Sequence, residues 1–113
     1  MSYIDMEKLQ YTVRHENKLL IPFIMENNST GKTLSLFYAD SEALERMTTP
    51  EQDGKCYVWR FARSHKKVEK KGATSGNVME VVSISPDCEY KSLLVKVIPS
   101  GPACHTGKES CYD

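Results

Sequence analysis

Five short segments, rich in β-branched and aromatic residues and separated by polar or turn-forming residues, constrain what this 113-residue chain can fold into. Such segments predict β-strands, because these side chains pack well on a pleated surface and because a typical strand has about four to eight residues. The segments are residues 19–25, 34–38, 57–61, 78–84 and 93–98. A strand-rich fold is therefore expected.

A dense turn signal joins the first two segments, at Asn27, Asn28, Ser29, Thr30 and Gly31. The residues 29–33 also look like the end of a phosphate-binding loop of the P-loop type. That motif requires a glycine at position 26, where this chain has Glu, and it requires a helix where a strand is expected here. The stretch therefore predicts a β-hairpin.

One helix is expected over residues 42–47, because Asp40 or Ser41 can accept hydrogen bonds from its first backbone amides. Residues 65–71 are unusually charged, which fits a solvated edge strand or a phosphate-binding strip. No repeat or linker divides the chain. The sum is an α+β, strand-rich single domain with one short helix, spanning residues 1–113.

Composition argues against several classes of function. Fifteen basic residues balance fifteen acidic ones, so the basic excess used in general nucleic-acid binding is absent. No apolar run approaches the roughly 20 residues that span a bilayer. The first ten residues lack the apolar core of a secretory leader. We therefore expect a cytoplasmic protein without nucleic-acid or membrane partners.

Four cysteines, Cys56, Cys88, Cys104 and Cys111, carry the most chemical information. Two disulfides are one possibility, but in a reducing compartment thiolates more often bind a soft metal such as zinc. Three thiolates would leave one zinc position open, as in a catalytic site, whereas Cys56 or His105 could close the site as a fourth ligand. Cys56 lies in a strand pattern that also suits a small apolar filler.

The C-terminal stretch that contains these cysteines, residues 101–107 with Ser110 and Cys111, resembles the signature of the phosphoribosyl-AMP cyclohydrolase family. Three further blocks resemble that family in the same order: residues 20–22 with 30–32 and Leu34, residues 42–44, and residues 71–77. The four blocks together cover the chain from about Leu20 to Cys111.

The resemblance implies an intertwined homodimer with zinc held by Cys88 of one chain and by Cys104 and Cys111 of the other. It implies hydrolysis of the N1–C6 bond of the adenine ring of phosphoribosyl-AMP, in histidine biosynthesis, by a water that the zinc activates. His105 would carry protons. The ribose-phosphate end of this nucleotide substrate would be held by Arg63, Lys71, Thr74, Ser75, Gly76 and Asn77.

The family also has a magnesium site, in the pattern Asp-Cys-Asp-x-Asp. This chain keeps an acid at Asp87, has the longer Glu89 at the second position and has Lys91 at the third. A lysine cannot supply the oxygen ligand that magnesium requires, although its ammonium group could neutralise the two remaining carboxylates.

The difference from the family's magnesium pattern leaves an alternative open. The protein would then be a paralogue that keeps the zinc and the dimer but binds a nucleotide without hydrolysing it, or acts on another purine-like ring. A redox-sensing thiol protein is a third class. The two remaining histidines, His15 and His65, are expected to face solvent.

Overall fold

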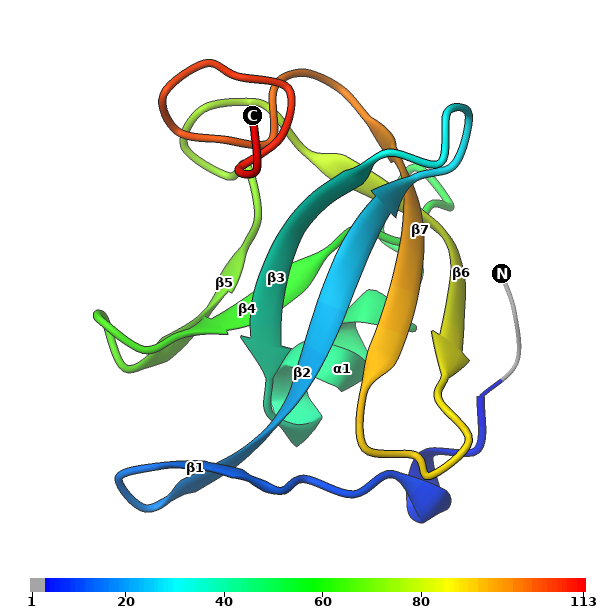
Figure 1. The fold of residues 1–113 in the computed structure, drawn as a ribbon, viewed down its shortest axis with the longest axis vertical. Helices are drawn as coiled ribbons and strands as arrows, with labels where there is room; N and C mark the ends of the chain where they lie inside the picture. The colour runs from blue at the N-terminus through cyan, green and yellow to red at the C-terminus, as the bar shows by residue number, and fades with distance from the viewer. Residues whose placement is uncertain (1–3) are drawn as a thin grey trace.

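The computed structural model describes residues 4–113 of the chain. Figure 1 shows its elements in chain order: a 3₁₀ turn η1 (Met6–Lys8), strands β1 (Val13–His15), β2 (Lys18–Asn27) and β3 (Thr33–Ala39), helix α1 (Ser41–Met47), and strands β4 (Trp59–Ala62), β5 (Lys67–Lys70), β6 (Met79–Pro86) and β7 (Leu93–Pro99). All five predicted strand segments and the predicted helix are confirmed. Strand β1 was not predicted. The strand predicted over residues 57–61 begins at Trp59 in the structure, and Tyr57 makes only an isolated β-bridge to Glu80.

The main sheet has the order β1-β2-β7-β6, and β3 pairs with β2. The predicted hairpin is present, with Ile24 opposite Leu36 in the antiparallel β2–β3 ladder. Gly31 has φ +76 in its turn, a conformation that glycine adopts without steric cost. β2 also pairs with β7 in parallel, which brings together two segments about 70 residues apart in the sequence.

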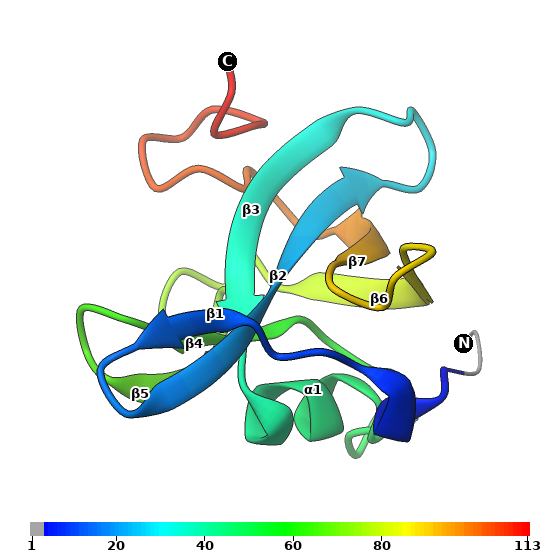
Figure 2. The ribbon, with the colours of Figure 1, turned by 60° about the horizontal axis from the view of Figure 1, so that its bottom comes forward.

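Helix α1 covers one face of this sheet (Figure 2), and its apolar side contributes Ala43, Leu44 and Met47 to the core. The helix begins where the sequence predicts, because Asp40 accepts a hydrogen bond from the backbone N–H of Ala43 at 2.8 Å. The Asp40 carboxylate also pairs with Lys18 at 3.1 Å. Strand β2 and helix α1 are thereby joined where the helix begins.

The core is a single cluster of buried apolar side chains between the sheet and α1, with Phe23, Met25, Leu44 and Met79 among its members. Cys56 belongs to this cluster and is 7% exposed, as expected of an apolar filler. The structure is thus one strand-rich domain with mixed parallel and antiparallel pairing, and α1 is the only α-helix among residues 4–113. No helix in that range is long and apolar enough to span a membrane.

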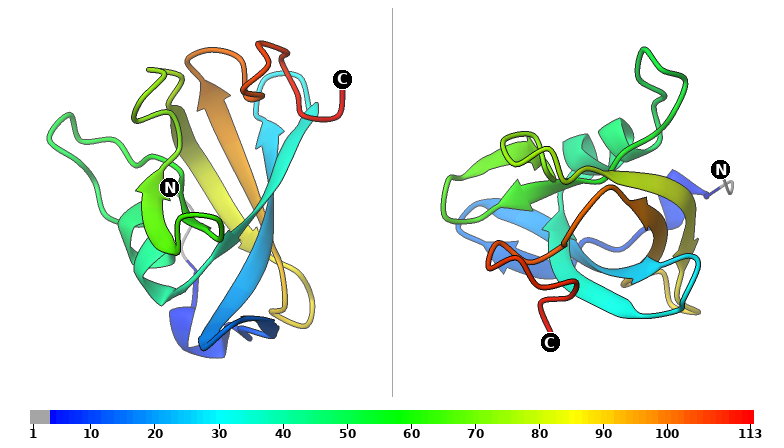
Figure 3. Two further views of the ribbon diagram at one scale, coloured as in Figure 1. Left: turned by 90° about the vertical axis from the view of Figure 1, so that its left-hand side faces the viewer. Right: turned by 90° about the horizontal axis from the view of Figure 1, so that it is seen from above.

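Strands β4 and β5 form a separate two-stranded ribbon, in which Arg60 lies opposite Glu69. The charged run 65–71 therefore does contain an edge strand. The ribbon projects beside β3 and leads into the loop 71–77, which lies next to the C-terminal loop at one end of the molecule (Figures 1 and 3). This end positions most of the residues expected in the functional site.

Candidate functional site

The loop 71–77 and the C-terminal loop 100–111 pack closely against each other. A Cβ atom added to Gly101 would lie 2.3 Å from Oδ1 of Asn77, so the side chain of Asn77 packs directly against the C-terminal loop. Gly72 is confined within its own loop, because a Cβ atom there would lie 2.3 Å from the backbone carbonyl group of Asn77. The loop 71–77 and the C-terminal loop, which are some 25 residues apart in the sequence, thereby form one surface.

Two of the three predicted zinc ligands lie together on this surface. The Cys104 Sγ lies 3.0 Å from the hydroxyl oxygen of Thr106. Hydrogen bonds from the Thr106 side chain and backbone lower the pKa of the Cys104 thiol, and interactions with Cys111 and Lys108 lower it further. A thiol that loses its proton readily is suited to metal binding, since the thiolate is the ligand. The side chain of His105 is exposed beside Cys104.

Lys71 brings a positive charge to the same place. The pKa of its ammonium group is lowered, mainly by burial and to a smaller extent by the positive charge of Arg60. The thiols of Cys111 and Cys104 act in the opposite direction and raise this pKa. Lys71 therefore lies within electrostatic reach of both thiols and of Arg60. The predicted phosphate-binding lysine and two of the three predicted zinc ligands therefore lie near one another.

Cys88 lies elsewhere. It is exposed in the turn between β6 and β7, which is at the opposite end of the sheet from the C-terminal loop (Figure 1). β7 runs between the two ends over seven residues, which is roughly 20 Å in an extended strand. Among residues 4–113, no three His, Cys, Asp or Glu side chains of one chain are grouped so as to hold a metal ion.

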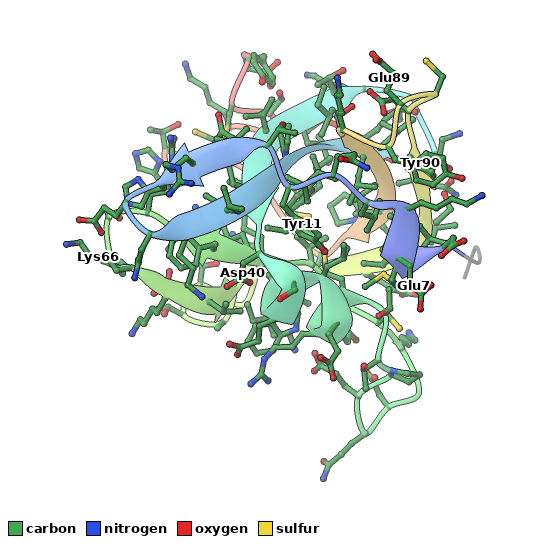
Figure 4. The ribbon with its side chains drawn as sticks, turned by 90° about the horizontal axis from the view of Figure 1, so that it is seen from below. Glu7, Tyr11, Asp40, Lys66, Glu89 and Tyr90 are labelled. Carbon is green, nitrogen blue, oxygen red and sulfur yellow. The ribbon has the colours of Figure 1, made fainter. Side chains whose placement is uncertain are left out.

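The predicted magnesium carboxylates are engaged within their own turn. Asp87 accepts a hydrogen bond from the backbone N–H of Lys91 at 2.8 Å and another from the hydroxyl of Ser92 at 3.0 Å. These bonds lower the pKa of the Asp87 carboxyl. The Lys91 ammonium lies 3.5 Å from Glu89, which Figure 4 shows in the same turn. The residues present therefore do not fit a three-carboxylate magnesium site.

Two hollows are lined in part by the β4–β5 ribbon. The "β5 hollow" has a volume of about 650 Å³ and is lined by parts of β4 and β5 and by residues 71–75, which include Lys71, Thr74 and Ser75. The "β3–β4 hollow" has a volume of about 540 Å³ and lies between residues 36–38, residues 60–64 and His15. Arg63 lines the β3–β4 hollow and not the β5 hollow, so it lies apart from Lys71, Thr74 and Ser75. The other two predicted substrate-binding residues, Gly76 and Asn77, line neither hollow.

Sequence reasoning missed two residues of these hollows. Arg60 lines both of them, but its position in a strand gave no signal that distinguishes it from other charged strand residues. The expectation that His15 faces solvent is wrong, because its side chain is 29% exposed and its Nε2 atom is buried. His65 is exposed as expected and pairs with Glu69 at 2.9 Å.

Comparisons with known proteins agree with the resemblance seen in the sequence. The family model for phosphoribosyl-AMP cyclohydrolase matches residues 35–113. The chain is 41% identical to the phosphoribosyl-AMP cyclohydrolase of Listeria innocua over 96 residues, which are 85% of this chain and 87% of the relative. It is 43% identical to that of Chloroherpeton thalassium over 105 residues, 93% of this chain and 71% of the relative.

Other relatives are longer. The chain is 45% identical to the histidine biosynthesis bifunctional protein of Shewanella oneidensis over 93 residues. These aligned residues are 82% of this chain but only 42% of the relative. It therefore spans less than half the length of this bifunctional relative. The match to the family model and to the relatives of similar length shows that the chain belongs to the phosphoribosyl-AMP cyclohydrolase family.

Proposed function

We propose that the protein is a zinc-dependent hydrolase that opens the adenine ring of phosphoribosyl-AMP at the N1–C6 bond, in histidine biosynthesis. The observation that carries this proposal is the joining of the loop 71–77 to the C-terminal loop, which places Lys71 within reach of Cys104 and Cys111. A cation for a substrate phosphate and two soft metal ligands are thereby available on one surface. Relatives of similar length bear the name of this enzyme.

Zinc is proposed to be held by Cys104 and Cys111 of one chain and by Cys88 of a second chain. The donor set fits, because two thiols are close together and the lowered pKa of Cys104 favours its thiolate form. Cys88 of the same chain is at the far end of the sheet, so a second copy has to supply it. When bound, zinc with three protein ligands activates water for hydrolysis.

The outer face of the main sheet provides a surface for that second copy. Ile24 of β2 lies on this face and is 38% exposed. Ile98 of β7 is 47% exposed and lies on the same outward side of the sheet. If two copies pack antiparallel through this face, each Cys88 turn meets the partner's C-terminal loop, and two equivalent sites form.

His105 is proposed to accept and donate protons during the reaction. It is exposed next to Cys104, so it can reach a substrate bound at the ligands without displacing core side chains. Lys71, Thr74 and Ser75, which line the β5 hollow, are proposed to hold a ribose-phosphate end there, with Gly76 and Asn77 continuing the same loop. No step is assigned to magnesium, since Lys91 already pairs with one of the two carboxylates.

The proposal is tested by following the absorbance of phosphoribosyl-AMP with zinc-loaded protein. The wild-type protein is expected to turn the substrate over, and Cys104→Ser is expected to abolish turnover and to lower the zinc content. Cys56→Ala is the matched control, because Cys56 is buried in the core and is expected to leave zinc content and turnover in place. Protein that holds zinc but does not hydrolyse the substrate would refute the proposal.

One observation favours a second candidate function. The replacement of a magnesium ligand by Lys91 removes a metal site that the family pattern contains. A paralogue that binds the nucleotide without opening its ring would then give saturable binding of phosphoribosyl-AMP by the zinc-loaded protein, with no change in ring absorbance.

A further inference from the structure

The β3–β4 hollow carries positive charge that no acidic residue of its lining balances. Its described lining residues include two guanidinium groups, those of Arg60 and Arg63, and no aspartate or glutamate. Arg63 stacks at 4.3 Å over the ring of Tyr38, and Arg60 stacks at 4.8 Å over the ring of Phe37. Stacking fixes the plane of each guanidinium group, while its N–H groups remain free to donate.

The acidic residues nearest this hollow already have other partners. Glu69 lies opposite Arg60 in the ribbon, but it pairs with His65 at 2.9 Å and with Lys67 at 3.8 Å. Glu16 pairs with Lys66 at 3.0 Å, and its other carboxylate oxygen lies 4.0 Å from the Nε2 atom of His15. Among the residues that the structure describes, neither arginine has a carboxylate within ion-pair distance.

Two buried polar atoms at the hollow also lack a partner. The Nε atom of Arg60 and the Nε2 atom of His15 are both buried, and neither makes a hydrogen bond within residues 4–113. A buried donor without a partner costs free energy, so such donors usually meet a ligand or water. The hollow therefore combines positive charge, an unsatisfied Nε–H donor of Arg60, a buried ring nitrogen of His15 without a hydrogen-bond partner, and a volume of about 540 Å³, which is in the range of small-molecule sites.

We propose that the β3–β4 hollow is an anion-binding subsite for a phosphate monoester, with Arg60 and Arg63 as its main ligands. This assignment rests on the proposed function in one respect. Phosphoribosyl-AMP has two phosphate groups, one on each ribose, and the β5 hollow with Lys71 accounts for only one of them. Arg60 lines both hollows, so it lies between the two phosphate positions and orients the substrate across the ribbon.

The subsite can be tested without any turnover, with inorganic phosphate as the probe. The chain has four arginines, Arg14, Arg46, Arg60 and Arg63, whose side-chain Nε–H signals can be assigned from single Arg→Lys variants. Titration with phosphate at constant ionic strength is expected to shift the signals of Arg60 and Arg63 to saturation and to leave the other two in place. Four signals that move together without saturation would overturn the proposal.

Kinetics then test the role of Arg60 as a positioning residue. Losing a charge-assisted hydrogen bond to phosphate is expected to raise KM for phosphoribosyl-AMP by about tenfold or more in Arg60→Gln and in Arg63→Gln, with little change in kcat. Arg60→Lys is expected to restore part of this loss, because it keeps the charge. Arg46→Gln is the matched control, since Arg46 also stacks on an aromatic ring, that of Trp59 at 4.7 Å, but lines neither hollow.

The outcomes separate this inference from the proposed function. Wild-type protein that binds phosphate at both arginines but does not hydrolyse phosphoribosyl-AMP would refute the proposed function and leave the anion subsite standing. Active wild-type protein whose KM is the same in Arg60→Gln would overturn the inference alone. If Arg60→Gln or Arg63→Gln instead dissociates a dimer in sedimentation, the hollow receives a partner chain and not a small anion, and the inference is wrong.

Discussion

Replacing Gly72 with alanine tests the close packing inside the loop 71–77, which contacts the C-terminal loop through Asn77. Gly72 has φ +84, and an added Cβ atom would lie 2.3 Å from the backbone carbon and oxygen of Asn77 and 2.6 Å from the nitrogen of Val78. Backbone atoms cannot rotate away as a flexible side chain can. The loop 71–77 therefore has to shift, and its contact with the C-terminal loop shifts with it.

The magnitude follows from two contributions. The left-handed conformation costs an alanine about 1–2 kcal/mol, of which about 0.4–1 kcal/mol is offset because alanine restricts the unfolded chain. Overpacking against backbone adds about 1–3 kcal/mol. We therefore expect Gly72→Ala to lower the free energy of unfolding by about 2–4 kcal/mol.

Gly54→Ala is the matched control, because Gly54 has φ +80 and an added Cβ atom would meet nothing within 4 Å. It carries the conformational cost without the clash and should lose about 1 kcal/mol or less. Urea unfolding of both variants, at one protein concentration, measures the difference. Equal losses would refute the close approach of residues 72 and 77.

Three further predictions concern the helix, a tyrosine and the metal pattern. Asp40→Ala should lower the free energy of unfolding by about 1–2 kcal/mol, because it removes the cap that accepts from Ala43, while Asp40→Asn should lose less in the same urea assay. The hydrogen bond to Asp53 raises the pKa of Tyr57 to about 12. This hydrogen bond therefore stabilises the folded protein fully below the ordinary tyrosine pKa of 10.0, and the stabilisation is lost as the pH rises through about 12. Absorbance at alkaline pH should show one tyrosine titrating earlier in Asp53→Asn than in the wild type. Lys91→Asp should raise the affinity for Mn²⁺, used as a spectroscopic probe for magnesium, and unchanged affinity would show that more than this residue has diverged.

Much of the fold was predictable because its signals are local. The strands at 19–25 and 93–98 follow from runs of apolar residues, and α1 follows from Asp40 and the acidic residues after it. The strand β1 has only three residues, all of which pair with β2, and it is too short to give such a local signal. The parallel pairing of β2 with β7 depends on contacts distant in sequence, which no local pattern specifies.

The site was predictable in part for the same reason. The residue types at Cys104, Cys111 and Lys71 suggested metal and phosphate chemistry, and the structure brings these three together. The separation of Arg63 from the loop 71–77 could not be foreseen, because it depends on the direction in which the β4–β5 ribbon projects. His15 became part of a hollow only through the packing of β1 beside that ribbon.

The central claim, that two chains share each metal site, is tested most directly by mixing two inactive variants. Cys88→Ser and Cys104→Ser are each expected to lack zinc-dependent hydrolysis of phosphoribosyl-AMP. After the two are unfolded and refolded together in equal amounts, half of the dimers contain one chain of each kind, and one of their two sites has all three cysteines.

Activity and bound zinc should then return to about a quarter of the wild-type values, as expected for random pairing in a twofold symmetric dimer. Refolding each variant alone is the control and should restore neither quantity. If the mixture stays as inactive as its components while refolded wild-type protein recovers, the ligands do not come from two chains, and the account of the site is wrong.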